Sequence, residues 1–201
     1  MKHAIALMLL VLGIFDSSEI IHAGPITYTF QTINLPGAGS TGLSDINDAG
    51  QIVGYATNAN PAREHGFVYS DGTFTSLDLP GANPVFTYPH GINDSGQIVG
   101  SYNQIHGFLY TNGVTTNIDF PGSGDTDALG INNAGQIVGI YYDPSLGMPA
   151  GFLYSHGIFK TITIPGASYA IAFAINDIGQ VVGDYIDAVG SGHAFLYQNG
   201  S

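Results

Sequence analysis

Short runs of valine, isoleucine, threonine, phenylalanine and tyrosine alternate with clusters of glycine, asparagine and aspartate along most of the chain. Beyond residue 23 no run has helical character, and β-branched and aromatic residues dominate. Such residues favour strands, whereas Gly, Asn and Asp favour tight turns. The pattern therefore predicts a domain of short β-strands joined by hairpins.

The runs form a fourfold repeat. The segment INDAGQIVG (residues 46–54) returns as INDSGQIVG (92–100), INNAGQIVG (131–139) and INDIGQVVG (175–183). Each repeat reads as four strands, a to d: the first ends in Ile-Asn, the second begins at Gly-Gln, the third holds Phe-x-Tyr, and the fourth is threonine-rich. A period of roughly 43 residues with four antiparallel strands is typical of a β-propeller blade.

The two ends of the repeat array bear on blade number. TYTFQTINLPG (residues 27–37) has the sequence of a d strand with no preceding c, and HAFLYQNGS (193–201) is a c strand with no following d. We therefore expect an all-β propeller of four four-stranded antiparallel blades, closed by the N-terminal strand completing the last blade. A piece of a larger propeller or array is the alternative.

The first 23 residues have the organisation of a secretory signal peptide. Lys2 and His3 precede an apolar run at residues 4–14, followed by a polar stretch and a candidate cleavage site at residues 21–23. An apolar run of this length is too short to span a bilayer as a helix. The expected organisation is a signal peptide at 1–23 and one propeller domain at 24–201. The mature chain would be secreted, extracellular or at the cell surface, with the periplasm as a further option, and not membrane-inserted.

Charge and cysteine content narrow the classes of partner. The chain has a net charge of −12, contains no cysteine, and is 9% charged and 44% hydrophobic. A strongly acidic surface repels phosphate backbones and anionic lipid, so nucleic acid is not an expected partner. Without disulfides, the secreted domain must be held by its hydrophobic core.

The repeat resembles the HAF family of bacterial extracellular repeats, which is named for a His-Ala-Phe motif. That motif stands here as His193-Ala194-Phe195, with variants at His65-Gly66-Phe67 and His106-Gly107-Phe108, whereas the third copy has Ala150 in place of histidine. The resemblance covers nearly all of the chain after residue 23. It implies a secreted or surface-located protein and brings no catalytic residues to transfer.

Metal and cofactor chemistry is not predicted. His65, His106 and His193 start equivalent strands in different repeats, so a ring would spread them apart, and we expect them to be hydrogen-bonding rather than metal-ligating. The Asn-Asp-x-Gly turns offer too few carboxylates for calcium, and their side chains should bond their own turn backbone. Asp125-Thr126-Asp127 is the one loop with calcium-like spacing. The four recurring glutamines, Gln51, Gln97, Gln136 and Gln180, are expected to bond neighbouring backbone.

A ligand site is expected where the repeats differ. The b-to-c connections span 13, 8, 13 and 12 residues from glycine to phenylalanine, and in a propeller they emerge on the same face as the d-to-a connections. The hypothesis is a binding or scaffold module for a glycan, peptide or surface polymer, because aromatic planes beside carboxylates suit such ligands. The alternatives are an extracellular polysaccharide hydrolase or lyase, and a purely architectural surface protein. The candidate binding residues on these loops are Arg63, Phe86, Tyr88, His90, Asp127, Tyr142, Asp143 and Tyr169.

Overall fold

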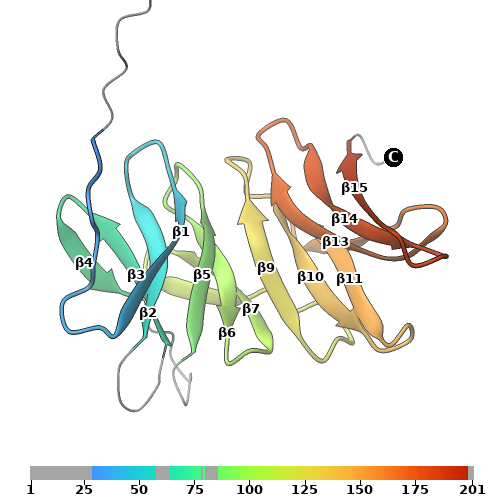
Figure 1. Cartoon of the computed structure of the whole chain (residues 1–201), viewed down its shortest axis with the longest axis horizontal. Coiled ribbons are helices and arrows are strands. Elements are labelled where there is room, and N and C mark those ends of the chain that lie inside the picture. The colour runs from blue at the N-terminus through green and yellow to red at the C-terminus, as the bar shows by residue number, and fades with distance from the viewer. Residues whose placement is uncertain (1–28, 58–63, 78, 80–85, 199–201) are drawn as a thin grey trace, which may run out of the picture. The chain divides into compact units, whose positions relative to one another are not determined.

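The structure is a computed structural model that describes residues 29–57, 64–77, 79 and 86–198. The chain divides into two compact units, residues 1–32 and 33–201. All strands of the described residues lie in the second unit (Figure 1). The expected signal peptide and Arg63 lie outside the described residues.

The second unit is all-β, as predicted, with four antiparallel sheets that follow the four sequence repeats. In each sheet the strands pair in chain order, which is the arrangement that short hairpins impose. The first sheet contains β1 (Ser40–Ile46), β2 (Ile52–Thr57), β3 (Glu64–Ser70) and β4 (Thr73–Ser76), and the second contains β5 (Thr87–Ile92), β6 (Ile98–Tyr102), β7 (His106–Thr111) and β8 (Val114–Asn117). The third contains β9 (Thr126–Ile131), β10 (Ile137–Asp143), β11 (Met148–Ser155) and β12 (Ile158–Ile162), and the fourth contains β13 (Ala167–Ile175), β14 (Val181–Asp187) and β15 (Gly192–Tyr197).

The fourth sheet has three strands within the described residues. Residues 29–37, the described part of the segment expected to supply its missing strand, are not in a strand, and most of them are exposed. The expectation of four sheets of antiparallel strands is therefore confirmed, whereas closure by the N-terminal segment is not shown.

Consecutive sheets pack through the first strand of the later one. Strand β5 lies against β1, β2 and β3, β9 against β5, β6 and β7, and β13 against β9 to β12. A glycine in the third strand of each of the first three sheets permits this approach. A Cβ atom on Gly107 would lie 2.5 Å from the Ile118 carbonyl oxygen and 3.3 Å from Thr126 Cγ2. The small residue of the His-Gly-Phe motif is therefore a packing requirement.

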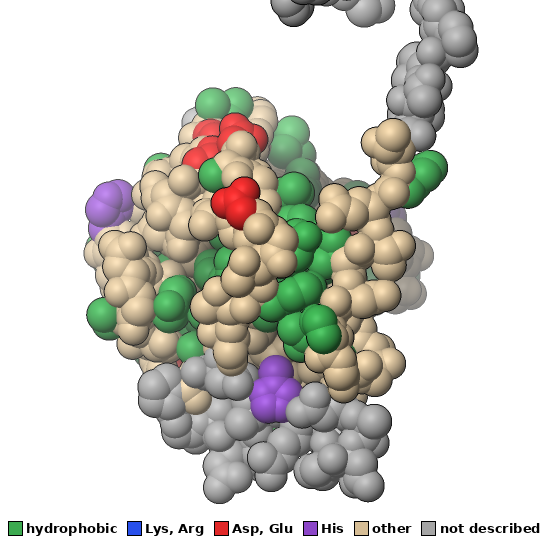
Figure 2. Space-filling view, turned by 90° about the vertical axis from the view of Figure 1, so that its left-hand side faces the viewer, with side chains coloured by type: hydrophobic (Ala, Val, Ile, Leu, Met, Phe, Trp, Pro, Cys, Tyr) green, Lys and Arg blue, Asp and Glu red, His purple; other side chains and the backbone are tan. Residues whose placement is uncertain are grey.

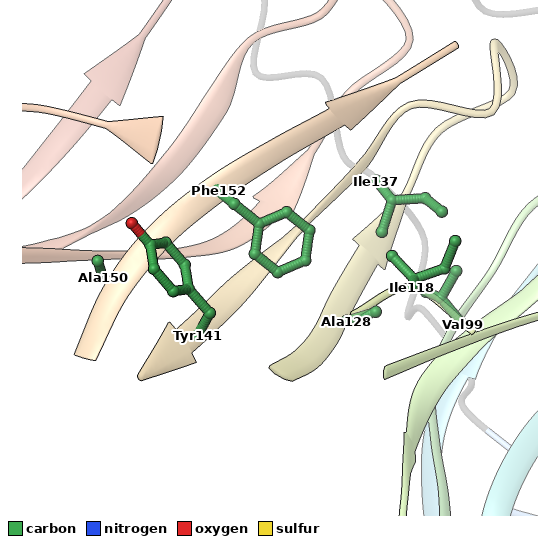
Figure 3. Close-up of a cluster of buried hydrophobic side chains, with 7 residues drawn as sticks. All are labelled: Val99, Ile118, Ala128, Ile137, Tyr141, Ala150 and Phe152. Carbon is green, nitrogen blue, oxygen red and sulfur yellow. The ribbon is translucent and has the colours of Figure 1, made fainter. Parts of the chain in front are cut away.

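The hydrophobic core lies between the sheets. Between the second and third sheets, Phe152 is fully buried, and the Phe120 and Tyr141 rings stack with centroids 3.6 Å apart. The Tyr141 hydroxyl lies 2.9 Å from Thr161 Oγ1, so the one polar end of this buried ring has a partner. Figure 3 shows the cluster, which is formed by Val99, Ile118, Ala128, Ile137, Tyr141, Ala150 and Phe152.

The Asn-Asp-x-Gly turns are linked from sheet to sheet through their asparagines. Asn47 Oδ1 accepts a hydrogen bond from the Gln51 backbone N at 2.9 Å, which closes its own turn as expected. Its Nδ2 donates to Gln51 Oε1 at 2.9 Å and to the Asn93 carbonyl oxygen in the next sheet at 3.1 Å. The glutamine prediction was therefore wrong in its partner, because the side chain bonds the asparagine amide. The equivalent inter-sheet bonds join Asn93 to Asn132 and Asn132 to Asn176.

The side chain at the second position of these turns also forms hydrogen bonds with the turn of a neighbouring sheet. Asp94 Oδ1 accepts from the Asp48 backbone N at 2.8 Å, and Asp177 Oδ1 accepts from the Asn133 backbone N at 2.8 Å. Asn133 Nδ2 bonds carboxylate oxygens on both sides, at 2.6 Å to Asp94 and 2.9 Å to Asp177. The prediction that these side chains bond their own turn holds for the asparagine position and is wrong for the aspartate position.

Candidate functional site

A cleft of about 440 Å³ lies between the second and third sheets, at the end of the sheets that carries the b-to-c and d-to-a connections. Its wall from the second sheet combines aromatic and polar side chains, and its wall from the third adds two carboxylates. The lining residues are Tyr88, His90, Ser101 and Gln104 on one side, and Asp125, Thr126, Asp127, Ile140, Tyr141, Tyr142 and Pro149 on the other.

A β-bulge determines where His90 lies. Pro89 pairs with Gly100 and Gly91 pairs with Val99, so His90 is an extra residue without a cross-strand partner. A bulge bends the strand and redirects the inserted side chain. The same irregularity recurs in β1, β9 and β13, where the extra residue is serine, leucine or phenylalanine. The bulge is therefore a shared feature of the repeat, and histidine at this position is specific to the second sheet.

The connection between β6 and β7 is a tight turn with an unusual backbone. Asn103 and Gln104 both have positive φ, at 52° and 63°, and the Ile105 backbone N donates to the Tyr102 carbonyl oxygen at 3.3 Å. Positive φ at both central residues is the geometry of a type I′ hairpin, in which glycine is favoured. Glutamine at such a position is uncommon, and its exposed side chain lines the cleft.

Aromatic rings form much of the wall. The Tyr88 ring meets Tyr55 edge to face with centroids 5.5 Å apart and lies parallel to the His90 imidazole at 6.5 Å. Tyr141 is buried, but Tyr142 is 41% exposed. The half-buried Tyr88 and the exposed Tyr142 therefore offer apolar surface with polar tips to a ligand in the cleft.

His90 and Asp127 face each other across the two sheets. His90 Nε2 lies 3.1 Å from Asp127 Oδ1, with both side chains about one-third exposed. The contact lacks the angle of a hydrogen bond, and Asp127 Oδ1 has no hydrogen-bond donor within the part of the chain that the structure describes. Asp127 Oδ1 is itself buried beside the imidazole, so a ligand can reach only the exposed part of the two side chains, about one-third of each.

The d-to-a connection of the third sheet is held against β10. The Tyr142 backbone N donates to Asp125 Oδ1 at 3.0 Å, and Ser123 Oγ donates to the Tyr142 carbonyl oxygen at 2.9 Å. The Asp125 carboxylate thus fixes the backbone of Tyr142, while Asp127 faces His90. Asp125 and Asp127, considered for calcium on sequence, have different partners in the structure.

The cleft thus gathers four of the eight candidate residues, namely Tyr88, His90, Asp127 and Tyr142. Phe86 lies just outside it, where it forms an isolated bridge with Glu64 and accepts a hydrogen bond from the Asn103 backbone N. Tyr169 lines a separate depression on the fourth sheet.

Asp143 caps the β10–β11 turn. Its Oδ1 accepts from the Ser145 backbone N at 2.8 Å and from Ser145 Oγ at 2.6 Å. These bonds lower the pKa of Asp143. A hydrogen bond from His193, then one from the Ser191 backbone N, similarly lowers the pKa of Asp187. A general acid needs a raised pKa, so neither carboxyl is suited to be the general acid of glycoside cleavage.

The repeat histidines pair with carboxylates. His106 Nδ1 lies 3.0 Å from Asp119 Oδ2, and His193 Nε2 lies 3.0 Å from Asp187 Oδ2. Among the described residues, no group of three or more His, Cys, Asp or Glu side chains is placed to hold a metal ion. Within the same residues, no helix is both long and apolar enough to cross a bilayer.

Sequence reasoning missed Ser101, Gln104 and Thr126, which also line the cleft. One signal was available: the second b-to-c connection is the shortest of the four, which singles out the repeat whose turn carries Gln104. Nothing in the local sequence of Ser101 or Thr126 distinguishes them from ordinary strand residues.

No family model and no curated protein matches the chain. Similar solved structures include two of a point mutant of the Aleuria aurantia lectin, one in complex with alpha-methyl-L-fucoside and one with Fucalpha1-6GlcNAc. Each is 14% identical to this chain with a TM-score of 0.43, over 75% of this chain and 54% of the lectin chain. The chain thus spans about half the length of the lectin chains it matches, and a likeness this weak carries no argument about ligand or activity.

Proposed function

We propose that the protein binds a neutral glycan in the cleft between the second and third sheets. The observation that carries the proposal is that the cleft brings together Tyr88, Tyr142 and the partly exposed His90–Asp127 pair. Sugar rings present C–H faces that pack on aromatic rings and hydroxyls that bond carboxylates and amides. The cleft supplies both kinds of surface, and its volume lies in the range of small-ligand sites.

Charge favours a neutral ligand over an acidic one. The cleft contains two carboxylates, Asp125 and Asp127, and no lysine or arginine among its lining residues. The whole chain carries a net charge of −12. A uronic acid, sulfated sugar or phosphate would therefore meet like charge at the site and over long range.

The wider architecture forms part of the proposal. The four sheets are proposed to be blades of a β-propeller, supported by their meander order and the packing of each first strand on the preceding sheet. Secretion to the extracellular space or cell surface is supported by the signal-like residues 1–23. An exported binding module of this kind would meet glycans of an envelope or a surface polymer.

A glycan array with the purified chain, followed by titration calorimetry on the best neutral oligosaccharide, tests the function. Tyr142→Ala and Asp127→Asn should each weaken binding at least tenfold, because each removes a contact that the ligand makes directly. Val114→Ala is the matched control, since Val114 is exposed outside the cleft, and it should bind like the native protein. A folded sample that binds no neutral glycan, or that binds one equally well in all variants, would reject the proposal.

A further inference from the structure

The interface between neighbouring sheets is repeated three times and uses the same positions each time. The valine after Gln-Ile is fully buried in the first three sheets, at Val53, Val99 and Val138. It packs there with residues of the next sheet: Val53 with Ile92, and Val99 with Ala128. The equivalent residue of the fourth sheet, Val182, is 46% exposed. Among the described residues, no sheet covers the face of the fourth sheet that corresponds to this buried face in the first three.

The first sheet presents the other half of the same interface. The first-strand position filled by Pro89, Ala128 and Ala172 is fully buried in the later three sheets. Its equivalent in β1, Leu43, is 50% exposed, and Ile46 is 60% exposed although its equivalent Ile92 is 5% exposed. Figure 2, which views the molecule from the side of β1–β4, shows hydrophobic side chains gathered at the centre of that face.

The inter-sheet hydrogen bonds of the turn asparagines leave a donor in the fourth sheet and an acceptor in the first sheet that could pair with each other. Asn93 Nδ2 has two acceptors, one of them the Asn132 carbonyl oxygen in the next sheet. Within the described residues, Asn176 Nδ2 has one acceptor, Gln180 Oε1. The Asn47 carbonyl oxygen accepts from the Gly50 backbone N and, in the same part of the chain, from no asparagine side chain. Within the described residues, the Asn176 amide thus lacks the inter-sheet acceptor and the Asn47 carbonyl oxygen lacks the inter-sheet donor that the internal turns have.

We infer that the free face of β13–β15 docks the free first strand, β1, of a second copy of this chain. Apolar surface meets apolar surface and the unpaired turn groups meet each other, which continues the interface already built three times within the chain. The contact joins two different faces and can therefore recur. In the dimer inferred here, a two-fold axis forms the contact twice and closes a ring of eight sheets.

The interface between the first and second sheets indicates which residues of the two copies would be in contact. A Cβ atom on Gly66 would lie 2.9 Å from Thr87 Cγ2 and 3.0 Å from Pro89 Cγ, across the first internal interface. By position in the repeat, Ala194 corresponds to Gly66 and Leu43 corresponds to Pro89. Ala194 is exposed, whereas Gly66, Gly107 and Gly151 are buried. Ala194 carries the Cβ atom that Gly66 lacks, and Leu43 stands where the internal interface has proline. The contact between copies must therefore be wider than the internal one, with Ala194 of one copy facing Leu43 of the other.

Cysteine cross-linking tests this contact without interference, because the chain has no native cysteine. Leu43→Cys and Ala194→Cys are made in separate chains and mixed under mild oxidation. A disulfide-linked heterodimer is expected. The matched control, Ile158→Cys mixed with Leu43→Cys, should give little product, because Ile158 is exposed on β12 away from either free face. A doubly substituted chain that cross-links as a monomer at high dilution would overturn the inference in favour of closure within one chain.

Sedimentation equilibrium on the unmodified chain provides the second test. A mass of two chains is expected, and raising the salt concentration should favour the dimer, because two copies each of net charge −12 repel one another. Val182→Asp should yield a folded monomer by circular dichroism, whereas Ile158→Asp should remain dimeric. A native chain that is monomeric, for instance because its own N-terminal segment covers the face, or that forms open-ended polymers would overturn the inference.

Discussion

The side-chain amide of Asn93 donates a 3.0 Å hydrogen bond to the carbonyl oxygen of Asn132, in the next sheet. Asn93 is 4% exposed and also accepts from the Gln97 backbone N at 3.0 Å. One short side chain therefore closes its own hairpin and joins two sheets. The repeat of this asparagine every 39 to 46 residues records a structural linkage between modules.

Replacing this asparagine should destabilise the array in a position-dependent way. Asn93→Ala removes bonds within the turn and between sheets and leaves buried polar groups unpaired, so we expect a loss of about 2–3 kcal/mol in the free energy of unfolding. Asn176→Ala is the matched control, because Asn176 bonds its own turn and, among the described residues, has no onward acceptor. It should cost about 1 kcal/mol. Urea denaturation of both variants gives the comparison, and equal losses would show that the inter-sheet bond contributes nothing.

A side chain at Gly107 should be strongly destabilising. Its Cβ would lie 2.5 Å from the Ile118 carbonyl oxygen, which is backbone and has little room to move. Gly107→Val should therefore lower the unfolding free energy by about 3 kcal/mol through overpacking. Gly124→Val is the control, since a Cβ there would have no atom within 4 Å. Differential scanning calorimetry should show a large fall in Tm for the first variant and a small one for the second. Similar Tm values for the two would contradict the packing argument.

Replacing Gln104 with glycine should lower glycan affinity with little effect on the free energy of unfolding. Because its φ is 63°, glycine is as well suited to this backbone, and Gln104→Gly should change the unfolding free energy by less than about 1 kcal/mol. The same change removes an amide from the cleft, so glycan affinity should fall severalfold. Gln198→Gly, outside the cleft, serves as the control for binding. Calorimetric titration and thermal melting on one preparation measure both quantities, and unchanged affinity would remove Gln104 from the site.

Acid should destabilise the fold through Asp143 and Asp187. Hydrogen bonds lower the pKa of both carboxyls in the folded state, so each contributes stability above its ordinary pKa. That stability is lost as pH falls through the lowered folded-state value. The Tm of the native chain should therefore drop as pH is lowered below about 4. The drop in Tm should be smaller in Asp143→Asn and Asp187→Asn than in the native chain. Variants whose Tm depends on pH as it does in the native chain would argue against a role of these bonds in stability.

The residues that recur in every repeat allowed the sheets to be predicted. The residues that differ between repeats allowed only part of the candidate site to be predicted. The strand order followed from INxxGQIVG and Phe-x-Tyr, because hairpin turns and β-branched runs are local signals. The partner of Asp94 was mispredicted because it depends on how sheets stack, which no single repeat encodes. The partner of Gln97 is local, and the prediction took backbone where the structure has the Asn93 side chain of the same turn. Tyr88 and Asp127 were predicted to lie on connecting loops, which is wrong, because they belong to strands β5 and β9. They line the same cleft because β9 packs against β5. The bulge that redirects His90 leaves no local sequence signal.

The most direct test of the central claim is a crystal structure of the chain with the neutral oligosaccharide selected on an array. We predict a sugar ring in the cleft between the second and third sheets, with its C–H face against Tyr88 or Tyr142 and a hydroxyl bonded to the Asp127 carboxylate. A glycan bound on any other surface, with this cleft holding only water, would contradict the account.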